Sequence, residues 1–254
     1  MQKPLILVTN DDGITAPGIR HLVEYMNEIS EVVVVAPNSP QSGKGHAITI
    51  NSTLTFEEIN LDGPQRDYAL SGTPVDCVKF ALDKILTRRP DIVVSGVNHG
   101  ANSSINVIYS GTMSAAVEAG VEGLPAIGFS LLDFSWDADF SQAKDFIQDI
   151  VRKTLLRPMP KGVVLNVNIP KLKKEEIQGI KICRQAHAKW EESFDERTNP
   201  HGKKYYWLTG YFNNMDQGED ADETALAQGY ISVVPVKFDL TAHEYIEQLK
   251  KDLY

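Results

Sequence analysis

Short apolar, β-branched runs alternate with helical patterns over the first two-thirds of the chain. Residues 5–8 and 32–36 have the composition of buried strands, and apolar residues at helical spacing fill positions 19–29 between them. The alternation continues through strands predicted at 91–95, 126–130 and 163–168. Strands that alternate with helices are typical of an α/β protein with a parallel sheet. We therefore predict a Rossmann-like three-layer sandwich with a mostly parallel, doubly wound sheet.

Less regular patterns predict the elements between these strands. Residues 47–57 alternate loosely, which favours a hairpin, and residues 67–70 fit a short strand. Thr73 and Pro74 are a good N-cap and first helical residue, so a helix is expected to begin there.

The character of the chain changes beyond about residue 186. Aromatic residues gather among polar ones, and an acidic loop spans residues 216–223. A strand is predicted at 231–234 and a closing helix over 242–249. We treat residues 1–254 as one domain, with a Rossmann-like core over residues 1–185 and a C-terminal arm, strand and helix over residues 186–254.

The bulk composition narrows the class of protein. The chain has 254 residues, of which 42% are hydrophobic, which is enough for a sizeable core. Its formal net charge of -9 argues against a nucleic-acid partner, which needs a basic face. The two cysteines, Cys77 and Cys183, make no disulfide or zinc framework, and no signal peptide or membrane-spanning run is present. We therefore expect a cytoplasmic protein with neither nucleic acid nor membrane as a partner.

Two adjacent carboxylates, Asp11 and Asp12, follow the first predicted strand. The carboxyl ends of parallel strands open onto the ligand crevice of such a sheet, so both side chains are expected at the rim of a site. Carboxylates this close repel each other unless a cation or a proton lies between them. A divalent metal is the simplest way to keep both ionised. A purely structural alternative fits equally well, in which Asp11 caps the turn and Asp12 faces solvent.

Two further loops at the same edge offer neutral oxygens. Ser42 lies in the loop 37–46, and Asn98 lies in the loop 96–102. Carboxylates, a hydroxyl and an amide together suit Mg²⁺ or Mn²⁺ rather than zinc. Each residue also has a simpler interpretation, as a turn residue at Ser42 and as a turn amide at Asn98.

A possible anion site follows at Ser110, Gly111 and Thr112, which open a predicted helix. Free backbone N–H groups and the positive end of the helix dipole favour a phosphate there. The alternative is that Ser110 is an ordinary N-cap. His46 and His99 fit solvated or structural roles better than catalytic ones.

Several long motifs follow one another in a fixed order over residues 5–130. They are Ile6–Gly13 with Ala16–Gly18, Val35–Pro37 with Gln41–Gly43, Ser71–Asp76, Pro90–Asp91, Ser95–Asn102 and Tyr109–Ala116. Through these motifs the chain closely resembles the SurE family of survival-protein 5'/3'-nucleotidases. A looser match at residues 206–210 and 229–232 extends the resemblance almost to the C-terminus.

The resemblance implies a phosphatase that acts on nucleoside monophosphates, with a possible side activity on short polyphosphate. It implies one divalent metal per subunit, Mg²⁺ or Mn²⁺, and a homodimer or homotetramer held by the C-terminal arm. It places the metal on Asp11, Asp12, Ser42 and Asn98, and phosphate contacts on Asn98, Asn102, Ser110, Gly111 and Thr112.

Two local features qualify this resemblance. Residues 104–106 read Ser-Ile-Asn where many members carry two acidic residues, which affects the loop but leaves the implied ligands intact. The aromatic residues after position 186 resemble an arm that reaches a neighbouring subunit, although they would also fit a small local core.

Three mechanisms fit these residues. In the first, a metal-activated water attacks phosphorus, and Asp11 or Asp12 is the catalytic carboxylate that takes its proton. In the second, Asp11 is itself the nucleophile, but such enzymes usually place a second acid two residues on, where this chain has Gly13. In the third, the chain is a nucleotide sensor without turnover. A dinucleotide-dependent oxidoreductase is disfavoured, because the first strand-to-helix turn lacks a glycine triplet.

Overall fold

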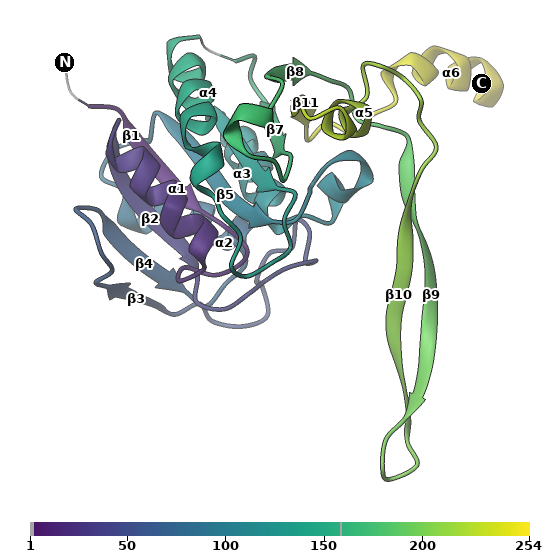
Figure 1. The fold of residues 1–254 in the computed structure, drawn as a ribbon, viewed down its shortest axis with the longest axis horizontal. Coiled ribbons are helices and arrows are strands. Elements are labelled where there is room, and N and C mark those ends of the chain that lie inside the picture. Colours follow the sequence, from purple (N-terminus) through teal and green to yellow (C-terminus); the bar gives the residue numbers. More distant parts are fainter. Residues whose placement is uncertain (1–2, 158) are drawn as a thin grey trace.

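The computed structural model describes residues 3–157 and 159–254. Nine of the strands in these ranges form one sheet in the order β3-β4-β2-β1-β5-β6-β7-β11-β8 (Figure 1). They are β1 (Leu5–Thr9), β2 (Glu31–Pro37), β3 (Phe56–Ile59), β4 (Arg66–Leu70), β5 (Ile92–His99), β6 (Ala126–Leu131), β7 (Val163–Ile169), β8 (Ile180–Ile182) and β11 (Ile231–Lys237).

The sheet is parallel through its centre, and the predicted α/β class is confirmed. Neighbouring strands run parallel from β4 through β2, β1, β5 and β6 to β7. Antiparallel pairs join β3 to β4 and β11 to β7. The chain leaves β1 toward β2 on one side and later returns to β5 on the other side of β1. A crevice is expected at the carboxyl ends of β1 and β5, where the strand order reverses.

Helices cover both faces of this sheet (Figure 1). The longer helices are α1 (Pro17–Asn27), α2 (Pro74–Phe80), α3 (Gly111–Val121), α4 (Lys144–Leu156), α5 (Asp222–Ala227) and α6 (Ile246–Leu253). A π-helical turn spans Ala81–Ile85, and 3-10 turns span Ser104–Ile108, Ser141–Ala143, Lys174–Glu176 and His243–Tyr245.

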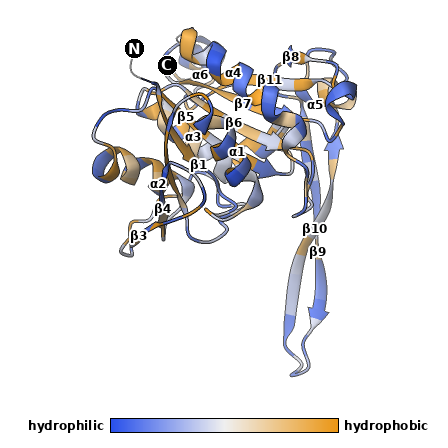
Figure 2. Cartoon of the chain, turned by 60° about the vertical axis from the view of Figure 1, so that its left-hand side comes forward, coloured by the Kyte–Doolittle hydropathy of each residue, from blue (hydrophilic) through white to orange (hydrophobic). Residues whose placement is uncertain are grey.

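The two-residue repeat of the strands divides the core into two layers. Ile6 and Val8 of β1 pack with the apolar faces of α1 and α4. Leu5 and Leu7 point the other way and pack with residues of α2 and α3. A strand that is buried on both faces is apolar throughout, which explains the continuous runs in the sequence. Figure 2 shows apolar residues gathered on the central strands.

The hairpin expected over residues 47–57 is wrong. The segment is irregular as far as Thr55, and the hairpin forms instead between β3 and β4. The reason lies at the start of α2, where the Asp76 carboxylate accepts hydrogen bonds from the Thr49 backbone nitrogen (3.1 Å) and hydroxyl (2.6 Å). These bonds hold the segment against a helix cap, where it has no partner strand.

The C-terminal third leaves the sheet and then rejoins it. Strands β9 (Ala188–Thr198) and β10 (Lys204–Asn214) pair antiparallel and form a long hairpin that extends away from the body (Figure 1). This hairpin was not among the predicted strands. The acidic loop expected over 216–223 gives way to α5 at Asp222, and β11 then enters the main sheet beside β7. Of the C-terminal residues 186–254, the hairpin and α6 lie outside the main sheet, and we call them the C-terminal extension. Strand β11 belongs to the core.

None of the helices within the described ranges has the length and hydropathy needed to cross a membrane.

Candidate active site

The loops that follow β1, β2 and β5 meet at one edge of the sheet. The Gln41 backbone nitrogen donates to the Asp11 carbonyl (2.7 Å), which ties the loop after β2 to the Asp pair. The His99 backbone nitrogen donates to Asp12 Oδ2 (3.3 Å), which ties the end of β5 to the same pair. Residues far apart in sequence are thus brought together because their parallel strands end at the same edge.

Asp11 is a buried carboxylate, with 3% of its surface exposed. Burial and, to a smaller extent, the neighbouring charge of Asp12 raise the pKa of Asp11 to about 6. The Thr112 hydroxyl opposes this rise, because it donates a hydrogen bond to Asp11 Oδ1 (2.6 Å). Within the part of the chain that the structure describes, no ion pair neutralises Asp11, so a bound cation would relieve its electrostatic cost.

Asp12 is held by a histidine. Its Oδ2 contacts His99 Nδ1 at 3.0 Å in addition to the His99 backbone nitrogen, and only 14% of its side chain is exposed. The sequence predicts no role in the site for His99. The structure gives it the task of orienting Asp12, as partners of ligating groups commonly do.

Asn98 offers its amide oxygen. Its Nδ2 donates to the carbonyls of Gly100 (2.8 Å) and His99 (3.2 Å). These bonds use the nitrogen and fix the side chain, so the oxygen is the atom left for a ligand. The turn-amide interpretation is thus correct for the nitrogen, and it does not conflict with a ligand role for the oxygen.

The structure gives less support to Ser42 as a ligand. It follows Gln41, which is buried and bonded to Asp11, but Ser42 itself is exposed. The structure therefore brings the loop to the site without fixing the hydroxyl, and a ligand role for Ser42 stays a prediction.

Asn102 belongs to a buried amide network behind the site. Its backbone nitrogen donates to Asn168 Oδ1 (2.8 Å), and its Nδ2 donates to Ser130 Oγ (2.8 Å). Its carbonyl accepts from Asn166 Nδ2 (2.8 Å). This network fixes the end of the loop after β5, and a phosphate contact from Asn102 also stays a prediction.

Helix α3 begins directly against Asp11. Ser110 Oγ accepts from the Met113 backbone nitrogen (2.9 Å), so Ser110 is the N-cap of this helix. A Cβ on Gly111 would lie 2.6 Å from the Cβ of Asp11, which shows how closely the first turn approaches the carboxylate. The positive end of the helix therefore faces the same space as the Asp pair, where it would favour a further anion such as a phosphate.

The donors at this edge fit a hard divalent cation. They are the carboxylates of Asp11 and Asp12 and the amide oxygen of Asn98, with the Ser42 hydroxyl in the neighbouring loop. Oxygen donors of this kind suit Mg²⁺ or Mn²⁺. Throughout the described ranges, no three His, Cys, Asp or Glu side chains gather as a metal-binding group, so a site here depends on neutral oxygens as well as carboxylates.

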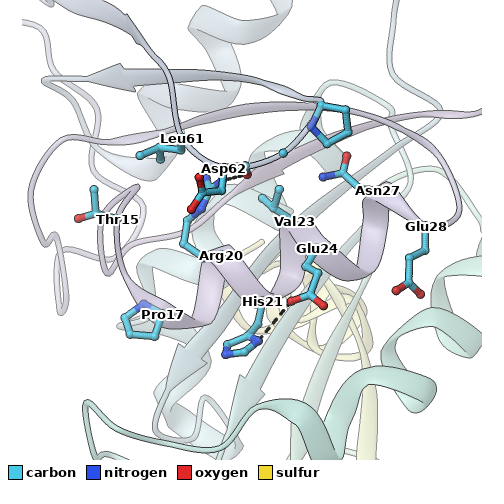
Figure 3. Close-up of a pocket in the computed structure, with 12 residues that line it drawn as sticks. Thr15, Pro17, Arg20, His21, Val23, Glu24, Asn27, Glu28, Leu61 and Asp62 are labelled. Atoms are coloured by element: carbon cyan, nitrogen blue, oxygen red, sulfur yellow. Dashed lines mark hydrogen bonds and ion pairs between the residues drawn. The ribbon is translucent and has the colours of Figure 1, made fainter.

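A separate hollow on the surface lies along α1 and carries no such chemistry. The cavity in Figure 3 is lined by α1 and the segment 61–64, with Arg20, His21 and Glu24 projecting from the helix. Arg20 is engaged by Asp67 at 2.6 Å, and His21 approaches Glu24 at 3.8 Å. None of the residues predicted for the site lines it.

The described geometry defines a class of protein: a doubly wound α/β protein whose acidic, oxygen-rich centre faces a helix N-terminus at the strand-order reversal. Residues 6–192 match the family model described as Survival protein SurE, so the chain belongs to the SurE family.

Relatives over the full length agree with this assignment. The 5'-nucleotidase SurE of Christiangramia forsetii is 66% identical over 250 residues, which cover 98% of this chain and 96% of that protein. The 5'-nucleotidase SurE of Flavobacterium psychrophilum is 65% identical, with 98% and 97% covered. The crystal structure of a SurE protein from Aquifex aeolicus superposes with a TM-score of 0.85 at 38% identity, covering 98% of this chain and 99% of that one.

Proposed function

We propose that this chain is a 5'-nucleotidase, a metal-dependent phosphomonoesterase that hydrolyses nucleoside monophosphates to nucleoside and phosphate. The observation that carries the proposal is the buried Asp11 carboxylate, which lies beside Asp12 and against the N-terminus of α3. Family membership and the names of full-length relatives at 65–66% identity point to the same activity.

Asp11, Asp12 and Asn98 would hold one Mg²⁺ or Mn²⁺ per subunit, with Ser42 completing the set. Such a cation, when bound, polarises a phosphoryl oxygen and lowers the pKa of a water. The first turn of α3, from Gly111 and Thr112, binds the phosphate and stabilises the charge that develops on it. Asn98, near the end of β5, and Asn102, in the loop after β5, contribute further contacts.

One carboxylate of the Asp pair accepts the proton of the attacking water. We assign this role to Asp11, which is buried beside Asp12 and lies against the first turn of α3. Its pKa of about 6 describes the protein without a cation, and a bound cation would lower it. His99 orients Asp12 through the contact between its Nδ1 and Asp12 Oδ2. The aspartyl-phosphate mechanism is less well supported, since residue 13 is glycine and no second acid stands two residues after Asp11.

Phosphate release is the first measurement. We expect release from a panel of nucleoside monophosphates with Mg²⁺ or Mn²⁺, and its loss with EDTA. Binding of nucleotide and metal by calorimetry, without release from any member of the panel, would overturn the enzyme and favour a sensor. A phosphoaspartyl adduct trapped during turnover would overturn the attack by water.

The chain is also proposed to associate with itself through the C-terminal extension. Large side chains on the hairpin are exposed, among them Phe194 (72%), Trp207 (63%) and Tyr211 (66%), and α6 has no buried residue. A groove of 820 Å³ near α3 is lined by apolar residues that include Phe238 and Leu240. Apolar surface of this kind is typical of an interface.

Light scattering tests this association. The intact chain is expected to have a mass that is two or four times the chain mass. Polar substitutions at Phe194 and Tyr211 together are expected to lower it, with the circular dichroism spectrum unchanged. A monomeric intact chain would contradict the proposal.

The two free, buried thiols, Cys77 and Cys183, fit the reducing conditions of a cytoplasmic location, which we also propose.

A further inference from the structure

Two large aromatic side chains stand at the rim of the active site. Phe134 and Trp136 lie in the loop 132–140, which follows β6. Strand β6 runs parallel to β5, with Asn98 opposite Ser130 and His99 opposite Leu131. The two loops therefore leave the sheet side by side at the same edge, which brings Phe134 and Trp136 to the centre built around Asp12.

The contacts between this loop and the site are direct. The Trp136 ring stacks on the His99 ring, with centroids 5.6 Å apart and an angle of 6° between the planes. His99 in turn holds Asp12 at 3.0 Å. Phe134 lies over Gly100, where a Cβ would come within 2.2 Å of Phe134 Cε1. Two contacts thus connect the indole to the Asp12 carboxylate.

The loop is anchored although its rings are open to solvent. Asp133 forms an ion pair with Lys171 (3.0 Å) and accepts a hydrogen bond from the Ser135 backbone nitrogen (3.0 Å). Phe134 is nevertheless 79% exposed and Trp136 60% exposed. Large rings that are fixed beside a polar centre and left bare are typical of a ligand site.

We propose that Phe134 and Trp136 form a stacking platform for the nucleobase of the substrate. The proposal rests on the proposed nucleotidase function and names the part of the substrate that this loop recognises. With the phosphate at Asp11, Asp12 and α3, the base lies one sugar away, toward the loop after β6. Because every base has an aromatic face, such a platform binds bases without selecting strongly among them.

Steady-state kinetics with two matched substrates test the platform. AMP and ribose 5-phosphate carry the same phosphate ester, but only AMP has a base. For wild type we expect a higher kcat/KM on AMP. In the double variant Phe134→Ala with Trp136→Ala, we expect kcat/KM on AMP to fall about 10-fold or more, mainly through KM. The value on ribose 5-phosphate is expected to stay within about twofold of wild type.

Two further variants sharpen the comparison. Trp136→Phe keeps a ring and is expected to retain most of the activity on AMP. Trp207→Ala removes an indole with a similar exposure of 63% from the hairpin and is expected to leave the preference for AMP unchanged. An unchanged preference in the double variant would overturn the platform. So would an equal loss on both substrates, because it would assign these residues to the support of His99 and Asp12.

A binding measurement separates this proposal from the function on which it rests. Adenosine, which has no phosphate, is expected to quench tryptophan fluorescence in wild type and not in Trp136→Phe, in which Trp190 and Trp207 remain. Wild type that quenches but releases no phosphate from either substrate would sink the nucleotidase and leave the base platform standing. Phosphate release from AMP without any quenching that depends on Trp136 would overturn the platform alone.

Discussion

Replacing Asp11 with asparagine is expected to lower turnover by at least about 100-fold, because residues that merely orient a ligand already cost about 10- to 100-fold. The same change is expected to stabilise the metal-free protein at neutral pH. Burial and Asp12 raise the pKa of Asp11 from 3.8 to about 6. The folded state therefore binds this proton more tightly than the unfolded state does.

The pH dependence of this stabilisation follows from the sign of the shift. In wild type, the contribution of Asp11 to the free energy of unfolding is fully present below pH 3.8. This contribution is lost as the pH rises through about 6. The asparagine carries no charge at any pH, so its advantage grows over this window and approaches about 2–3 kcal/mol above it. Urea unfolding in EDTA at about pH 5 and about pH 7.5 measures the difference.

Asp149→Asn is the matched control, because Asp149 is an exposed acid of α4 whose carboxylate pairs with Lys153 at 2.6 Å. It is expected to leave turnover unchanged and to alter the free energy of unfolding by less than about 1 kcal/mol. Turnover of Asp11→Asn near the wild-type rate, with metal present, would remove Asp11 from the catalytic group.

Replacing Gly18 with alanine is expected to lower the free energy of unfolding by about 3 kcal/mol, the upper end of the range for overpacking. Gly18 lies in the first turn of α1, where a Cβ would come 1.9 Å from the Val97 carbonyl oxygen and 3.2 Å from Phe140 Cζ. The carbonyl belongs to the segment that carries Asn98 and His99. Relief of the clash would therefore also displace the site, and specific activity is expected to fall with stability.

Gly123→Ala separates this steric effect from the conformational freedom of glycine. Gly123 has a φ of +75°, and a Cβ there would meet no atom within 4 Å. Its replacement is expected to cost about 1 kcal/mol through backbone strain alone and to leave specific activity unchanged. Equal costs for the two variants in urea unfolding would contradict the close packing of α1 on β5.

The elements that the sequence predicted best are those buried on both faces. Leu5–Val8 and Val32–Ala36 are apolar without a break, as expected for short strands that a parallel sheet buries on both faces. The hairpin expected at 47–57 failed because its alternation belongs to a segment whose backbone is bound by Asp76 of α2. The strands β9 and β10 were not predicted, because the hairpin that they form is exposed on both faces. Their sequences therefore lack the two-residue apolar repeat of a half-buried strand.

The residues of the candidate site also fall into those that the sequence predicted and those that it did not. Asp11, Asp12 and Asn98 were predicted from the sequence because polar residues of this kind stand at the ends of strands that share one edge, and the structure places them at that edge. His99 and Trp136 were missed because their roles depend on partners: His99 on Asp12, and Trp136 on the His99 ring. Two aromatic residues in the loop after a further parallel strand were the available signal.

The sequence by itself determined the class of fold, the edge of the sheet that carries the site and the residue types that serve it. Local apolar patterns and loop positions record these properties directly. Only the tertiary structure decided which groups meet: Thr112 on Asp11, His99 on Asp12 and Trp136 on His99. These contacts join residues up to 101 positions apart, and they are set by strand order and helix packing, which no local pattern encodes.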